Sequence, residues 1–71
     1  MSRLKELVYP NLYAEIMRNG EKQQDIGNLL GIAKTTVNHK LSGKYDWTIS
    51  EIETLCNHFK KDYYELFKRK D

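Results

Sequence analysis

Three side chains in the sequence have the chemistry of catalytic or metal-binding groups: Cys56, His58 and His39. A thiolate beside an imidazole could act as a nucleophile, and the same atoms could bind zinc. Cys56, however, stands on an apolar stripe between Ile52 and Phe59, which favours a buried hydrophobic role. His58 is two residues away, and residues two apart on a helix do not face each other. We therefore expect no enzyme activity, no metal site and no cofactor.

A second group of polar side chains lies between Lys34 and Ser42. Only Val37 and Leu41, four residues apart, are apolar in this stretch. A helix with so narrow an apolar stripe should lie on the outside of a domain, with its polar side chains free to bind something else. Residues 32–47 hold three lysines against one aspartate, a local net charge of +2 that equals the net charge of the whole chain.

Length and composition limit the organisation of the chain. It has 71 residues, 39% hydrophobic and 31% charged, which is typical of one small folded domain rather than a disordered tail. A single cysteine cannot close an intramolecular disulfide, which indicates a reducing compartment. No apolar run approaches a membrane span, and the N-terminus lacks the apolar stretch of a signal peptide. We expect one cytoplasmic domain over residues 1–71, with a short N-terminal extension at residues 1–9.

Local signals predict an all-α fold, because no segment alternates like a strand. Pro10 suits the first position of a helix that should stop at Asn19-Gly20, and a second helix should run from residue 22 or 23 to Gly31. The polar segment from Lys34 to Ser42 should form the third helix. Before the first helix, the apolar residues of the extension predict a short helical turn. Those residues are Leu4, Leu7 and Val8.

Capping signals predict the last two helices. Thr48 and Glu51 have the spacing of a capping box, and Asp62 precedes Glu65 by three residues in the same way. The fourth helix should bury the apolar stripe Ile49, Ile52, Leu55, Cys56 and Phe59. The apolar face of the fifth should be Tyr63, Leu66 and Phe67.

The stretch from Gln23 to Gly43 meets the requirements of two short helices that cross closely. Such a pair needs a small residue at the crossing, here Gly27, and a turn-permissive residue between the helices, here Gly31. Apolar residues for the interface are also present, at Ile26, Leu30, Ile32 and Val37. An ordinary helical hairpin would share some of these features, but the polar third helix and the basic segment after it favour DNA binding.

This stretch resembles the helix-turn-helix of the Cro and lambdoid phage repressor family, often labelled XRE, and the resemblance covers roughly residues 10–68. It implies a compact five-helix domain whose second and third helices form the helix-turn-helix. It also implies a sequence-specific regulator of transcription, of the phage or mobile-element type and acting as a repressor. The expected partner is double-stranded DNA with a pseudo-palindromic operator, bound by a homodimer.

The resemblance also implies the roles of individual residues. The third helix would enter the major groove and contact base edges through Lys34, Thr35, Asn38 and His39. The residues expected to contact phosphates are Gln23, Thr36, Lys40, Lys44 and Tyr45, with Lys22 as a further candidate. Thr36 could instead cover Ile32, and Tyr45 could shelter the end of the third helix.

Two positions depart from the family pattern. Lys40 stands where many members have an apolar residue, so its side chain is expected to point to solvent or phosphate. Ala33 stands where Ser or Thr usually caps the recognition helix, and alanine cannot accept the hydrogen bond of a cap.

Two questions stay open from the sequence. The last helix carries Tyr63, Tyr64, Leu66 and Phe67, which could form a dimer interface or could belong to the core. A protein-interaction module, such as an antitoxin or an anti-repressor, could use the same fold, since a fold does not fix a function. Aromatic or aliphatic anchors would then be expected on the third helix, where this chain has Lys, Thr, Asn and His.

Overall fold

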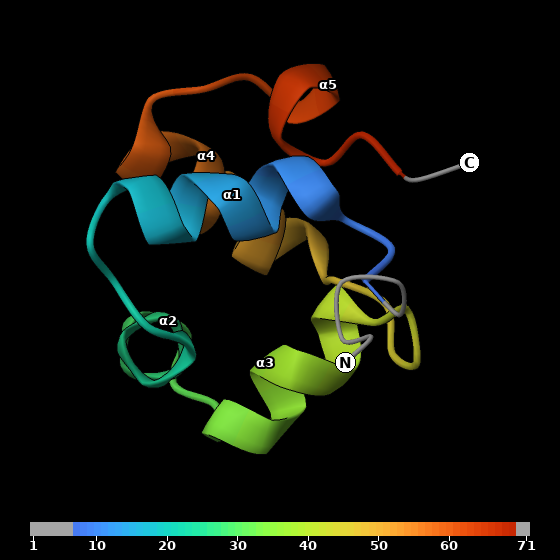
Figure 1. Cartoon of the computed structure of the whole chain (residues 1–71). Helices are drawn as coiled ribbons and strands as arrows, with labels where there is room; N and C mark the ends of the chain where they lie inside the picture. Colours follow the sequence, from blue (N-terminus) through green and yellow to red (C-terminus); the bar gives the residue numbers. More distant parts are fainter. Residues whose placement is uncertain (1–6, 70–71) are drawn as a thin grey trace.

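The computed structural model describes residues 7–69, which contain five α-helices and no strand. The helices are α1 (Pro10–Arg18), α2 (Gln23–Leu30), α3 (Lys34–Leu41), α4 (Ile49–Phe59) and α5 (Tyr63–Leu66). The predicted all-α, five-helix fold is confirmed. In Figure 1, α2 and α3 lie on one side of the molecule and α5 on the opposite side, with α1 and α4 between them.

The predicted signals set the helix boundaries. Thr48 Oγ1 accepts a hydrogen bond from the Glu51 amide at 3.1 Å, and Glu51 Oε1 accepts one from the Thr48 amide at 3.0 Å. Asp62 Oδ1 accepts a hydrogen bond from the Glu65 amide at 2.8 Å. Gly31 ends α2 in the left-handed region, with φ of 74°, which glycine adopts without the steric penalty of a Cβ. Short-range hydrogen bonds thus begin α4 and α5.

All five helices contribute to one hydrophobic core. Its most deeply buried side chains are Leu12, Ile16, Ile26, Val37, Leu41, Leu55 and Leu66. Beside them, Tyr9, Trp47 and Phe67 form a cluster of edge-on rings whose centroids lie 5.7–6.4 Å apart. Such edge-to-face pairs add to the stabilisation that burial gives. This cluster joins the segment before α1, the α3–α4 connection and the end of α5.

Residues 7–9 are not helical and bend at Val8, so the helical turn predicted there is wrong for these residues; Leu4 lies outside the described residues. The Val8 amide donates to the Leu41 carbonyl at 2.9 Å. Val8 also packs on Gly43, where an added Cβ would lie 2.6 Å from Val8 Cγ2 and φ is +86°. The segment is therefore held by the end of α3, and Gly43 is required both for its conformation and for this close approach.

The apolar stripes of α1 and α4 each continue for one residue beyond the part of the helix that packs in the core. Ile49 was expected to be buried but is 75% exposed, and Met17 at the end of the α1 stripe is 57% exposed. Each lies at one end of its helix. The apolar pattern marks the correct helix face at both places, but the packed neighbours end before the pattern does.

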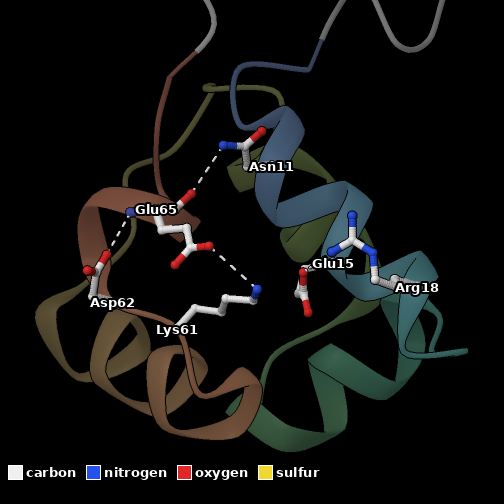
Figure 2. Close-up of polar contacts among 6 residues, drawn as sticks. All are labelled: Asn11, Glu15, Arg18, Lys61, Asp62 and Glu65. Carbon is white, nitrogen blue, oxygen red and sulfur yellow. Dashed lines mark hydrogen bonds and ion pairs between the residues drawn. The ribbon is translucent and has the colours of Figure 1, made fainter.

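A polar cluster joins α1 to α5 on the side away from α2 and α3 (Figure 2). Asn11 Nδ2 donates to the Glu65 carbonyl at 3.2 Å. Lys61 Nζ lies 3.5 Å from Glu65 Oε2, and Arg18 pairs with Glu15 on α1. Only the Asn11–Glu65 hydrogen bond joins the two helices, so we assign the docking of the last helix to it, whereas the two ion pairs are local and contribute little.

Ala33 is the residue that caps α3, and it offers no side-chain acceptor. Its extended backbone, with φ of −73° and ψ of 153°, suits a capping residue. Ala33→Ser should therefore stabilise the fold by about 1 kcal/mol and raise the melting temperature by roughly 5 °C. A thermal scan followed by circular dichroism measures this, with Ala33→Val as a variant that adds atoms but no acceptor. An unchanged or lower melting temperature for Ala33→Ser would contradict this cap.

Candidate nucleic-acid interface

Helices α2 and α3 meet at Gly27. A Cβ at this position would lie 2.6 Å from the backbone oxygen of Ile32, so only glycine fits without movement of the backbone. The Ile32 amide in turn donates to the Gly27 carbonyl at 2.9 Å. Figure 1 shows α2 nearly end-on and α3 across the view, so the two helices run in different directions. The predicted roles of Gly27 and Gly31 in a helix-turn-helix arrangement fit this geometry.

Helix α3 buries one narrow side and exposes the rest. Val37 and Leu41 have no exposed surface. Lys34 and Thr35 are exposed, whereas Asn38, His39 and Thr36 are partly exposed. The structure therefore places the four residues predicted to contact bases on the part of the helix that the core leaves accessible.

Asn38 is in contact with the start of α2. Its Nδ2 atom donates to Oε1 of Gln23 at 3.4 Å. Gln23, at the first position of α2, also has a backbone amide at the positive end of that helix. A residue predicted to read bases and one predicted to bind phosphate thus form a single polar unit. The sequence placed both at the interface but gave no signal that they contact each other.

His39, Lys44 and Tyr45 gather at the other end of α3. The His39 and Tyr45 rings pack edge to face with centroids 5.3 Å apart, and Lys44 Nζ lies 5.9 Å from the centre of the Tyr45 ring. The Lys44 and Tyr45 amides both donate to the His39 carbonyl, at 2.9 and 3.4 Å. The loop after α3 is therefore fixed against the helix, and it carries Lys44 and Tyr45 to the same end of the interface.

The expected exposure of Lys40 is wrong. Its side chain is buried, with 8% of the residue exposed, and Nζ lies 2.6 Å from Glu51 Oε1. The ammonium also lies 5.7 Å from the centre of the Trp47 ring. Lys40 therefore forms an internal ion pair between α3 and the first turn of α4, which leaves its ammonium unavailable to a phosphate. The departure from an apolar family position was the signal, because an inward-facing lysine requires a carboxylate partner.

Glu51 holds its charge through this pair. Burial acts to raise the pKa of the Glu51 carboxyl, but hydrogen bonds from Lys40 and the Thr48 amide outweigh it, and the pKa lies below its ordinary value. A carboxyl with a lowered pKa in the folded state stabilises the fold above its unfolded pKa, and that stability is lost as pH falls through the folded pKa.

Acidification should therefore destabilise the wild type more than a variant without this carboxyl. Between about pH 5.5 and about pH 3, the wild type should lose more unfolding free energy than Glu51→Gln does. Urea denaturation at both pH values measures the difference, with exposed Glu53→Gln as the control. Equal losses for the wild type and Glu51→Gln would contradict the assigned role of Lys40.

Three exposed lysines surround the polar face of α3: Lys22 before α2, Lys34 at the start of α3, and Lys44 in the loop after α3. Within residues 7–69, none of the three forms an ion pair. The nearby carboxylate of Asp25 accepts a hydrogen bond from the Lys22 amide at 2.9 Å and so caps α2. The free positive charges at both ends of α3 suit a polyanion.

Cys56 and His58 take part in other contacts. Cys56 is partly buried against the core, and burial, followed by the negative charge of Asp62, raises the pKa of its thiol. A raised pKa keeps a thiol protonated and unreactive near neutrality. His58 Nε2 lies 2.8 and 3.1 Å from the two carboxylate oxygens of Glu21. His58 thus ties α4 to the segment that precedes α2.

Within residues 7–69, no helix combines the length and the apolar character needed to span a bilayer.

Comparison with known proteins gives one family. The model of the BetR domain matches residues 2–71. No curated protein and no solved structure shows significant similarity to the chain. The family match covers nearly the whole chain, and the structure has the compact helical form expected of such a domain. The chain therefore belongs to the BetR domain family, a small helical domain of the DNA-binding type.

Proposed function

We propose that this domain is a sequence-specific regulator of transcription that inserts α3 into the major groove of double-stranded DNA. It would act as a repressor in the manner of the Cro and phage repressors that its helix-turn-helix resembles. The observation that carries the proposal is the surface of α3. The apolar side of this helix is buried, its polar side is accessible, and at both of its ends stand lysines that form no ion pair with the residues the structure describes.

The accessible side chains match the edges of the bases. Lys34 can donate to O6 or N7 of guanine, and Asn38 can pair with N6 and N7 of adenine. Thr35 can place its methyl group against thymine, and His39 can donate or accept a hydrogen bond. The contact between Asn38 and Gln23 limits the orientations that the amide can adopt and so favours one base over the others.

The remaining residues would bind the backbone of the duplex. Gln23 and Lys22 would bind a phosphate at the start of α2, where the helix dipole assists. Lys44 and Tyr45 would bind a second phosphate beyond the end of α3, and Thr36 a third. Lys40, bound to Glu51, is left out of this set.

A symmetric dimer would read a pseudo-palindrome with two copies of α3. Leu66 and Phe67 are buried in the core, whereas Tyr64 is 83% exposed and Tyr63 is half exposed. We therefore assign the dimer contact to Tyr63 and Tyr64 rather than to the whole apolar face of α5. Helix α5 lies on the side of the molecule away from α3 (Figure 1), so both copies of α3 would reach one duplex only if the protomers met at the edge of α5 rather than face to face.

Selection of bound duplexes from a random pool tests the proposal. The expected product is a short motif that occurs twice in inverted orientation, with the two centres about one helical turn apart. A purified, folded protein that enriches no sequence at low salt would overturn the proposal. Enrichment of a single half-site would support sequence-specific DNA binding but would contradict binding as a dimer.

Two substitutions separate the reading of bases from the binding of phosphates. Asn38→Ala should cost about 1–3 kcal/mol on the selected duplex and relax the preference at one base position. Lys44→Ala should weaken binding to all duplexes alike and reduce the dependence on salt. Fluorescence anisotropy with matched and single-substituted duplexes measures both, with exposed Lys68→Ala as the control for removal of a surface charge. Uniform weakening by Asn38→Ala would contradict its role at a base.

A further inference from the structure

A hollow of about 490 Å³ lies beside the α2–α3 surface, and nothing in the proposed DNA contact fills it. Its apolar wall is formed by Tyr13, Ile16 and Met17, three and four residues apart on one face of α1. The starts of α2 and α3 complete the rim, through Lys22 and Lys34. The volume falls in the range of sites that bind small organic molecules, about 300–1,000 Å³.

The apolar wall is accessible. Ile16 is fully buried at its base, but Met17 is 57% exposed although it is apolar and continues the buried stripe of α1. A methionine adapts its shape to different apolar ligands because its side chain is flexible and polarizable. Met17 therefore offers an apolar contact that the fold itself leaves unused.

The rim is positively charged. Among residues 7–69, neither Lys22 nor Lys34 forms an ion pair. Glu21 also lines the hollow, where its two carboxylate oxygens lie 2.8 and 3.1 Å from His58 Nε2. Two lysines thus stand against one carboxylate in the lining, and this net positive charge attracts an anion.

We infer that this hollow binds a small amphipathic organic anion, such as an aryl or alkyl carboxylate or sulfonate. Its apolar body would lie on Tyr13 and Met17, and its acidic group would be bound by Lys22 and Lys34. The smaller hollow between α1 and α5, of about 150 Å³, lacks this combination, because its four charged side chains pair with one another (Figure 2).

The position of the hollow gives the ligand a regulatory effect, and this part of the inference rests on the proposed DNA binding. Gln23, Lys22 and Lys34 belong both to the rim and to the set assigned to the duplex. A bound anion would neutralise two of the lysines assigned to the duplex and would occupy space beside them. The ligand should therefore oppose DNA binding, and by reciprocity DNA should oppose the ligand.

Titration with 8-anilinonaphthalene-1-sulfonate, without DNA and at low salt, tests the site by fluorescence. We expect saturable binding to the folded protein, weakened about tenfold or more by Met17→Glu, because that change places a like charge on the apolar wall. Lys22→Gln should weaken it about threefold. The matched controls are Leu29→Glu, an exposed apolar residue outside the hollow, and Lys68→Gln. Circular dichroism should verify that each variant is folded.

Absence of saturable binding, or equal weakening by Leu29→Glu, would overturn the site. The regulatory effect is tested separately by adding a selected duplex to the complex. Release of the probe supports antagonism, whereas a duplex that binds without releasing it overturns antagonism alone. If the probe binds as expected but no duplex binds, both the proposed DNA binding and the antagonism are wrong. The anion site is then still supported, because probe binding is measured without DNA.

Discussion

Replacing Glu51 by alanine should lower the free energy of unfolding by about 3 kcal/mol, since removal of one partner of a buried ion pair leaves the other charge uncompensated. Lys40 would be left beside the Trp47 ring without its carboxylate partner, and the Thr48 amide would lose its side-chain acceptor. For a domain of this size, the melting temperature should fall by roughly 15 °C. Urea denaturation and thermal scans measure the two quantities.

The matched control is Glu53→Ala, an exposed glutamate on the same helix for which we expect a change within about 0.5 kcal/mol. A second comparison separates the ion pair from the cap. The double variant Lys40→Met/Glu51→Gln removes both charges but keeps an acceptor for the Thr48 amide. Its free energy of unfolding should therefore fall by only about 1 kcal/mol. If Glu51→Ala lowered the free energy of unfolding as little as Glu53→Ala does, the Lys40–Glu51 pair would not support the fold.

Replacing Gly27 by valine should cost about 3 kcal/mol, because overpacking at a rigid contact forces the backbone to shift. The added Cβ would lie 2.6 Å from the Ile32 oxygen and 3.5 Å from atoms of Ala33 and Lys34, all of them backbone atoms. The movement of α2 relative to α3 should also weaken binding to the selected duplex, because both helices contact it in the proposed complex. Thermal scans and anisotropy titrations below the melting temperature measure the two effects.

Asn28→Val provides the comparison for Gly27→Val. Asn28 is the exposed neighbour on α2, so its substitution introduces the same β-branched side chain without the contact to the turn. We expect it to cost less than about 1 kcal/mol. If the two variants were equally stable, the close approach at Gly27 would not be what sets the crossing of α2 and α3.

Helix boundaries could be predicted from the sequence because short-range contacts determine them. Thr48 and Glu51 bond to each other's backbone within one turn, and Asp62 bonds to the Glu65 amide three residues later. The left-handed glycine after α2 is equally local. The narrow apolar stripe of α3 was enough to indicate that Val37 and Leu41 are buried, but it did not indicate that Lys40 is buried as well.

Contacts between distant residues could not be predicted in the same way. The side chain of Lys40 is polar, and the sequence alone could not show that Glu51, eleven residues away, would meet it in the interior. The link between Asn38 and Gln23 and the link between His58 and Glu21 likewise depend on how the helices pack. For Ile49, the pattern identified a helix face but not the point at which the neighbouring helices end.

The most direct test of DNA recognition by α3 is an NMR titration of ¹⁵N-labelled protein with a duplex obtained by selection. We expect the largest changes in amide chemical shift in residues 34–39, at the start of α2 and at residues 44–45. Smaller changes at Tyr63 and Tyr64 would accompany dimerisation. A duplex that binds while the amides of α3 keep their positions would contradict the claim that this helix is the one that reads DNA.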